Sequence, residues 1–176
     1  MAIKKAPTKK LIVNTVSEAV GEDALDIVFY LQGKKDISEF TIAEDLDIEI
    51  HQIRNILYRL NNEHLVTYRR KKDREKGWYI SYWTFNNPRV RELHLILKVK
   101  KLEKFQDRLD NEEKNKGNYF LCPNACVRMD FPTATEHDFR CPECGTILNQ
   151  QDNTRTIEML REKTDELISD IKKLKA

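Results

Sequence analysis

Apolar side chains recur every three or four positions in the first sixty residues, and this spacing predicts helices. Four helices are expected, over residues 9–20, 22–32, 41–46 and about 50–61. Thr41 and Glu44 have the spacing of a capping box, so Thr41 is predicted to cap the third helix at its N-terminus. The fourth helix is predicted to be amphipathic, because one stripe of it carries Ile50, Ile53, Leu57 and Leu60.

The apolar period then changes to roughly two, which predicts two strands joined by a charged turn. The strands are expected over residues 65–69 and 78–85, with the turn over 71–77. Side chains alternate along a strand, so Trp78 and Tyr82 share one face of the second strand while Tyr79, Trp83 and Phe85 share the other. One of these two faces is expected to pack on the core. Helix, short helix, turn, helix and hairpin is the order of a winged helix-turn-helix domain, predicted for residues 1–88.

Two long helices are predicted in the second half of the chain. Residues 89–116 form an expected linking helix, and residues 151–176 form a C-terminal helix whose apolar positions repeat like a coiled-coil seam. We expect the two seams to pair antiparallel; the alternative is that one seam packs on a partner protein. The predicted fold class is therefore mainly α with small β.

Four cysteines fall between the two long helices, within residues 117–150. They form two close pairs, Cys122 with Cys126 and Cys141 with Cys144, separated by a span that can fold back once. Thiolates in this pattern favour Zn²⁺ in a closed tetrahedral site, so the sequence predicts a zinc ribbon with one structural Zn²⁺. Short strands are expected over residues 119–121, 127–131 and 146–148. A fully ligated zinc has no open position for a substrate, which favours a binding protein over a metal-dependent enzyme.

The cysteine pattern has three other interpretations. Two disulfides require an oxidising compartment, and the first residues show no apolar secretion signal. A redox-active Cys-Pro-x-Cys motif explains one pair and not two. His137 lies between the pairs and is a further candidate ligand, but four sulfurs already complete the site.

Charge is distributed unevenly, although the net charge of the 176 residues is only +2. Acidic residues dominate positions 36–49, next to the fourth predicted helix, where the phosphates of a bound duplex would lie. This repulsion argues against major-groove reading and leaves that face to a basic protein surface. The helix itself offers His51, Gln52, Arg54, Asn55 and Arg59.

The hairpin is the better candidate for nucleic acid, because cations attract phosphates and exposed rings can stack on unpaired bases. The predicted contact residues for nucleic acid or polymerase are Arg69, Arg70, Lys71, Lys72, Arg74, Lys76, Trp78, Tyr79 and Trp83. The alternative is that the charged turn is only solvated and that the aromatic residues pack on the core.

The ordered set of elements resembles the archaeal transcription factor E family, the counterpart of the alpha subunit of general transcription factor IIE. The resemblance covers nearly the whole chain. Its specific parts are the Gly-Trp-Tyr-Ile-Ser-Tyr-Trp wing of residues 77–83 and the Cys-x3-Cys and Cys-Pro-x-Cys-Gly knuckles of residues 122–126 and 141–145.

The resemblance implies a general transcription initiation factor and not an enzyme. Such a factor binds the RNA polymerase clamp, assists TATA-box-binding protein and transcription factor B, and promotes or stabilises promoter opening with its wing near the melted non-template strand. It also implies zinc ligation by the four cysteines and contacts by the wing residues Lys71, Lys72, Arg74, Trp78, Tyr79 and Trp83. The chain ends at Ala176 without the long acidic extension of the eukaryotic subunit, and the need for a second subunit is left open.

The resemblance also implies a location in the cytoplasm of an archaeal-type cell, with the nucleoid. No apolar run of the sequence is long enough to cross a membrane. The rival function is a sequence-specific winged-helix transcriptional regulator with a zinc-ribbon oligomerisation arm. An enzyme is disfavoured, because the sequence lacks a Gly-rich phosphate loop, a His/carboxylate cluster and an activated serine motif.

Overall fold

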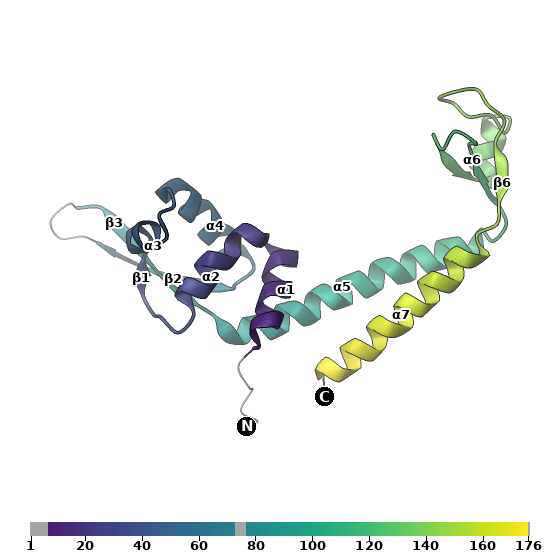
Figure 1. Cartoon of the computed structure of the whole chain (residues 1–176). Coiled ribbons are helices and arrows are strands. Elements are labelled where there is room, and N and C mark those ends of the chain that lie inside the picture. Colours follow the sequence, from purple (N-terminus) through teal and green to yellow (C-terminus); the bar gives the residue numbers. More distant parts are fainter. Residues whose placement is uncertain (1–6, 73–76, 176) are drawn as a thin grey trace. The chain divides into compact units, whose positions relative to one another are not determined.

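The helices and strands belong to two units, one ending at Leu97 and the other beginning at Lys98 (Figure 1). The computed structural model describes residues 7–72 and 77–175. Each unit is built around its own buried residues. None of the described helices is both long enough and apolar enough to cross a membrane.

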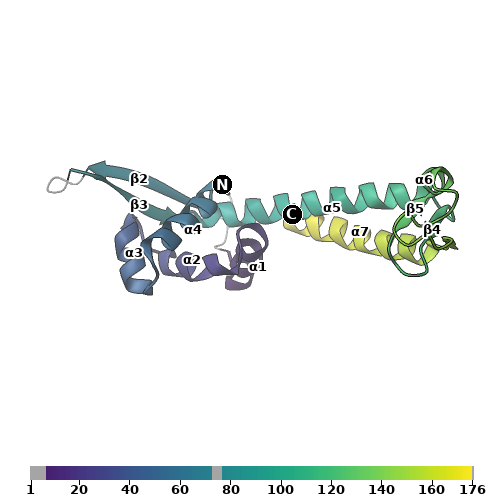
Figure 2. The ribbon, with the colours of Figure 1, turned by 90° about the horizontal axis from the view of Figure 1, so that it is seen from above.

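The first unit is a winged helix-turn-helix domain, as predicted. Its elements are α1 (Lys9–Ala19), the 3₁₀ turn η1 (Glu22–Ala24), α2 (Leu25–Leu31), β1 (Ile37–Ser38), α3 (Glu39–Leu46), α4 (Ile50–Asn62), β2 (Val66–Lys72), β3 (Tyr79–Phe85) and the first part of α5 (Asn87–Lys114). The strands form an antiparallel sheet in the order β1-β3-β2. β2 and β3 form the wing, in which Val66 pairs with Phe85 at one end and Lys72 pairs with Tyr79 at the other (Figure 2).

The prediction that Thr41 caps α3 is wrong, because the cap is Ser38. The helix begins at Glu39, and the side chain of Ser38 caps it by accepting a 3.0 Å hydrogen bond from the Thr41 amide. Thr41 therefore lies inside the helix. Glu39 explains the earlier start, because its buried carboxylate accepts hydrogen bonds from Arg54 of α4 and so ties the first turn of α3 to α4.

The core of the first unit confirms the predicted stripe of α4, whose Ile53, Leu57 and Leu60 are fully buried. It also identifies which face of β3 packs inward. Trp83 is fully buried and Phe85 nearly so, together with Val90 of α5.

The second unit contains a helix pair and a small sheet that we call the ribbon, residues 117–151. After the end of α5 come β4 (Tyr119–Leu121), β5 (Arg128–Asp130), α6 (Phe131–Glu136), β6 (Asn149–Gln151) and α7 (Thr154–Lys175). The strands are antiparallel in the order β5-β4-β6.

The predicted antiparallel pairing of the two long helices is confirmed. α7 runs back along the second half of α5 in both views (Figures 1 and 2). Lys98 Nζ lies 2.7 Å from Asp170 Oδ2, and Arg161 Nη2 lies 2.6 Å from Glu113 Oε1. The seam of α7 is buried at Ile157, Leu160, Thr164 and Ile171.

One of the two later ribbon strands is confirmed with slightly shorter bounds, as β5, and the other is displaced. The strand expected over residues 127–131 ends at Asp130, because the Asp130 side chain caps α6 by accepting from the Thr133 amide. The strand expected over residues 146–148 lies instead at β6, and Ile147 makes one isolated bridge with Arg140.

Candidate metal centre and nucleic-acid interface

Each pair of cysteines lies in a tight turn that is closed by a backbone hydrogen bond. In the first turn the Ala125 amide donates to the Cys122 carbonyl, and the left-handed conformation of Ala125 (φ 55°) accommodates the third intervening residue. In the second turn the Gly145 amide donates to the Cys141 carbonyl, and Gly145 adopts a φ of 71° that a residue with a Cβ would rarely take. Each turn therefore brings the two cysteines of a pair onto one short loop.

The four sulfur atoms converge on one point. All lie within 4.8 Å of one another, and Cys122 Sγ lies 3.5 Å from Cys144 Sγ. A tetrahedral ion with 2.3 Å bonds separates its sulfur ligands by about 3.8 Å, whereas a disulfide requires about 2.05 Å. All four cysteines are free thiols, so the disulfide interpretation is contradicted and the donor set fits a metal ion.

The electrostatics of the cluster also favour a cation. The Thr146 hydroxyl, 3.4 Å from Cys144 Sγ, and the Asn124 amide lower the pKa of Cys144 to about 6. In contrast, the hydrogen bond to Cys144 raises the pKa of Cys126 to about 12. One thiolate therefore opposes the ionisation of its neighbour, and a bound cation would remove that repulsion.

His137 is not part of this cluster. Its side chain is exposed, and among the residues that the structure describes the four cysteines are the group that could hold a metal ion. Cys122 and Cys141 are buried while Cys144 is exposed, so the site lies near the surface of the ribbon.

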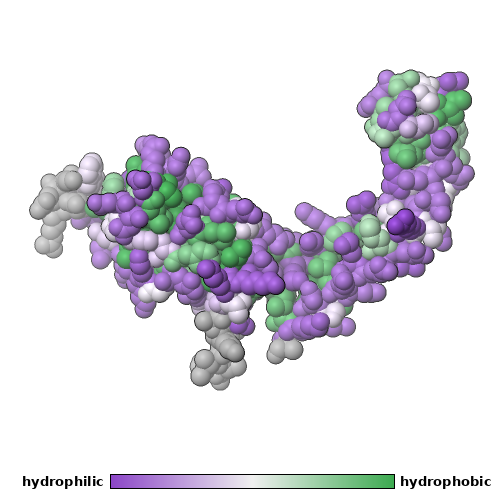
Figure 3. All heavy atoms as spheres, in the orientation of Figure 1, coloured by the Kyte–Doolittle hydropathy of each residue, from purple (hydrophilic) through white to green (hydrophobic). Residues whose placement is uncertain are grey.

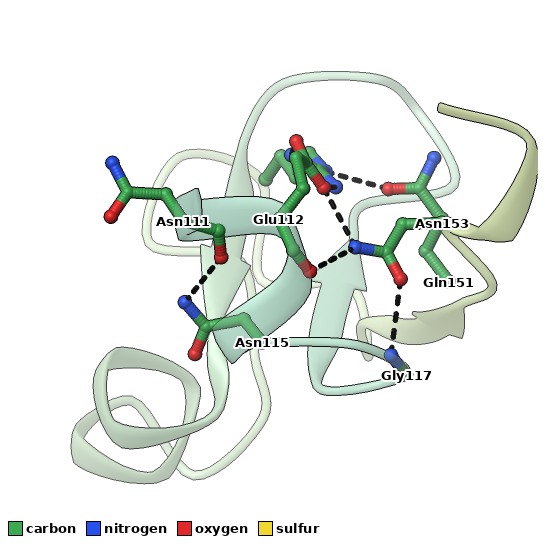
Figure 4. Close-up of polar contacts among 7 residues, drawn as sticks. Asn111, Glu112, Asn115, Gly117, Gln151 and Asn153 are labelled. Carbon is green, nitrogen blue, oxygen red and sulfur yellow. Dashed lines mark hydrogen bonds and ion pairs between the residues drawn. The ribbon is translucent and has the colours of Figure 1, made fainter. Parts of the chain in front are cut away.

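A buried polar cluster holds the ribbon to the helix pair, and sequence reasoning did not find it (Figure 4). Arg128 of β5 donates two hydrogen bonds, of 2.8 and 2.9 Å, to the carboxylate of Glu112 near the end of α5. Asn153, just before α7, donates to the same carboxylate and accepts from the Gly117 amide. Glu112 is almost fully buried, and the hydrogen bonds from Arg128 hold its pKa below the ordinary value. Single charged residues on a long solvated helix gave no signal that distinguished Glu112.

The wing presents most of its predicted contact residues to solvent. Arg69, Arg70, Lys71 and Lys72 are exposed along β2. Tyr79 and Trp78 are 67% and 54% exposed. Arg74 and Lys76 lie outside the described residues.

Trp83 does not belong to this exposed set. Its indole is fully buried and contacts the rings of Tyr58 and Tyr68, with centroids 5.9 and 4.9 Å away. The prediction that Trp83 contacts a partner directly is therefore wrong. Trp83 shares its strand face with Tyr79, but the core lies beneath Trp83 and no longer beneath Tyr79.

The exposed side of α4 is poorly suited to duplex phosphates. Its two arginines are already paired, Arg54 with Glu39 and Arg59 with Asp23. A pocket of about 650 Å³ opens beside the helix, and its lining includes apolar side chains and two carboxylates. It is lined by Asp23, Asp26, Ile48, His51, Gln52, Asn55 and Ile56. Some of the surface over α3 and α4 is apolar (Figure 3).

Comparison with known proteins gives a consistent result across nearly the whole chain. A family model of the TFIIE alpha subunit matches residues 10–118. Transcription factor E of Sulfolobus acidocaldarius is 35% identical over 163 residues, which cover 92% of this chain and 94% of the relative. Transcription factor E of Thermococcus kodakarensis is 34% identical, covering 90% and 85% of the two chains. The protein of the same name from Methanobrevibacter smithii is 37% identical, covering 88% and 86%.

Proposed function

The chain belongs to the TFIIE alpha family of general transcription factors, which are not enzymes, and we propose that it acts in initiation by binding RNA polymerase and promoting or stabilising promoter opening. The observation that carries the proposal is the contrast between the wing and α4. The wing combines exposed cations with exposed rings, whereas the arginines of α4 are ion-paired beside acidic groups. Cations and rings together suit unpaired DNA, because unpaired bases can stack on the aromatic rings and the cations attract the phosphates.

The wing is proposed to lie near the melted non-template strand. Its basic contacts are Arg69, Arg70, Lys71 and Lys72, together with Arg74 and Lys76 beyond the described residues, and its rings are Trp78 and Tyr79. Lys71 lies over the ring of Tyr82, with Nζ 5.2 Å from the centroid. This contact keeps one cation on the opposite face of the sheet from Tyr79.

The pocket beside α4 supports a protein partner with a basic surface. Asp26 supplies negative charge in the same lining as the apolar Ile48 and Ile56, whereas Asp23 is already paired with Arg59. This combination matches the aliphatic stem and charged end of a lysine or arginine. The proposed partners are the polymerase clamp, TATA-box-binding protein and transcription factor B, with promoter DNA. A second subunit remains a candidate partner.

The cysteine cluster is proposed to hold one structural Zn²⁺, with Cys122, Cys126, Cys141 and Cys144 as ligands. Four thiolates are soft donors and complete a tetrahedron, so the ion would stabilise the ribbon and leave no coordination site for a substrate. Metal analysis of the purified protein tests this directly. A stoichiometry other than one Zn²⁺ per chain would contradict it.

Promoter opening tests the function. Permanganate footprinting of polymerase complexes should show weaker opening with Trp78→Ala and Tyr79→Ala, by about 1–3 kcal/mol for each stacking ring lost. Phe131→Ala is the matched control, because Phe131 is 49% exposed but lies in the ribbon. Undiminished opening by folded Trp78→Ala and Tyr79→Ala proteins would exclude the wing from the mechanism. A footprint on duplex DNA without polymerase would instead favour a sequence-specific regulator.

A further inference from the structure

A line of rings and guanidinium groups crosses three elements of the winged-helix domain. Phe40 of α3 lies under Arg54 of α4, with the guanidinium carbon 5.6 Å from the ring centroid. Tyr58 follows Arg54 by one turn of α4 and contacts Trp83. Trp83 in turn contacts Tyr68 of β2, over which Arg70 lies at 5.7 Å. We call the five exposed or half-exposed members the aromatic–arginine stripe; they are Phe40, Arg54, Tyr58, Tyr68 and Arg70.

Core packing accounts for only part of this arrangement. Tyr58 and Tyr68 cover the buried indole of Trp83, yet they are 43% and 41% exposed, and Phe40 is 42% exposed. Arg54 is held in place by hydrogen bonds from its Nε and Nη2 to Glu39. The stripe thus presents three large rings to solvent, of which Tyr58 and Tyr68 are positioned by the buried Trp83 and Phe40 by Arg54. Such positioning lowers the entropy cost of binding a partner.

We propose that the aromatic–arginine stripe binds single-stranded nucleic acid and extends the wing's binding surface across β2 onto α4 and α3. This inference rests on the proposed function, in which the wing meets a melted strand. Arg70 and Lys72 lie on the same face of β2 as Tyr68. Lys72 pairs with Tyr79 at the far end of the sheet, so this face connects the stripe with the wing. The rings can accept successive bases of one strand, and Arg70 and Lys72 can attract its phosphates. Arg54 stays paired with Glu39 and contributes by lying over the ring of Phe40.

Base pairing and charge disfavour a duplex on this surface. The pocket with Asp23 and Asp26 is lined on α4 by His51 and Asn55, which adjoin Arg54 and Tyr58 of the stripe. A duplex lying across the helix would meet those carboxylates, and its paired bases would offer no faces to the rings. A single strand offers its base faces to the rings and can keep its phosphates toward Arg70 and Lys72 of β2.

The proposal predicts how binding depends on oligonucleotide length. Fluorescence anisotropy with labelled oligo(dT) of about 4 to 16 nucleotides, at low salt and with the full zinc-loaded chain, should show affinity rising with length. A Phe40→Ala/Tyr58→Ala protein should match the wild type on the shortest strands, which the wing alone can bind. On the longest strands it should bind at least about 25-fold more weakly, since each stacking ring contributes at least about 5-fold.

Two controls separate binding from folding. Phe40→Leu/Tyr58→Leu keeps an apolar cover over Trp83 but removes the rings, so it should retain the wild-type melting temperature and still lose affinity for long strands. Phe131→Ala removes an equally exposed ring from the ribbon and should bind all lengths within about twofold of the wild type.

Three outcomes would overturn the proposal. In the oligo(dT) assay they are wild-type binding of long strands by the folded leucine variant and equal losses on the shortest strands. The third, in a separate polymerase pull-down, is loss of polymerase binding without loss of oligo(dT) binding, which would make the stripe a protein interface. Because the oligo(dT) assay contains no polymerase or promoter, its result is independent of promoter opening. A wing that fails the opening test while the length dependence persists would reject the proposed function and leave the stripe in place.

Discussion

At the scale of single residues, Trp83 and Tyr79 have opposite roles although they lie on the same face of β3. Trp83 is enclosed by Tyr58, Tyr68 and the core, whereas Tyr79 lies on the exposed part of the wing, beyond the core. Replacing Trp83 with alanine should therefore lower the free energy of unfolding by about 3–5 kcal/mol, the usual cost of truncating a buried aromatic residue. Tyr79→Ala should change it by no more than about 0.5 kcal/mol. Urea unfolding compares the two, and similar losses would contradict the assignment.

The sequence predicted the alternation of this strand but not the point at which its inner face becomes exposed. Alternation is a local property of the backbone, so it placed Tyr79, Trp83 and Phe85 on one face. The extent of the core depends on residues far away in the sequence, here Tyr58 and Tyr68. The sequence pattern alone therefore cannot separate the buried Trp83 from the exposed contact residues of the wing.

Glu112 gives the ribbon a dependence on pH. The hydrogen bonds from Arg128 hold the folded-state pKa of Glu112 below its ordinary 4.5, so its stabilisation is complete above that pH and is lost as the pH falls through the lower folded-state value. Glu112→Gln should lower the free energy of unfolding by about 2 kcal/mol at neutral pH, and the difference from the wild type should shrink below about pH 4.5.

Glu113→Gln is the matched control for that titration. Glu113 is adjacent in sequence, but its ion pair with Arg161 is largely exposed, so its loss should cost less than about 1 kcal/mol. Unfolding measured in urea across pH 3–7 distinguishes the two. A Glu112→Gln effect that does not vary with pH would show that the residue acts through packing and not through its charge.

At the scale of elements, the pairing of α5 with α7 depends on a buried seam. Leu160 is almost fully buried, whereas its neighbour Met159 is 46% exposed on the same helix. Leu160→Ala should destabilise the second unit by about 2–5 kcal/mol, and Met159→Ala should have an effect within about 0.5 kcal/mol. Limited proteolysis of residues 98–114 provides the measurement. Unchanged resistance in Leu160→Ala would indicate that α5 is stable without its partner.

Long amphipathic helices were predictable because their seams repeat over many residues, whereas the short elements were not. α6 has six residues, and only the Asp130 cap and Pro132 in its first turn marked its start. The start of α3 was predicted too late because Ser38 and Thr41 are both good caps. The buried ion pair of Glu39 with Arg54 favours the cap at Ser38. The polar cluster around Glu112 joins residues from three elements, and such contacts leave no periodic pattern.

At the scale of the whole molecule, α5 belongs to both units, since it starts at Asn87 and continues to Lys114. The structure divides the chain into two units after Leu97, within the predicted linking helix. The division into four segments that the sequence suggests therefore stays a prediction. The two units differ in what stabilises them. Among the described residues, seventeen buried ones form the first core, whereas the ribbon core contains Cys122, Ala134, Cys141 and Leu148. We expect a core of that size to need metal ligation for stability.

Removing the metal should therefore affect the two units unequally. Hydrogen exchange after chelation should show at least about a tenfold loss of amide protection in β4 and β5, because binding energy is folding energy in small metal domains. Protection in α2 and α4 should stay unchanged, since their core contains no metal ligand. Cys144→Ser should reproduce the effect without chelator, because Cys144 is an exposed ligand whose loss leaves no cavity. His137→Ala should keep one metal ion per chain. Full protection of β4 and β5 in the metal-free protein would mean that the ribbon folds by its side-chain packing alone.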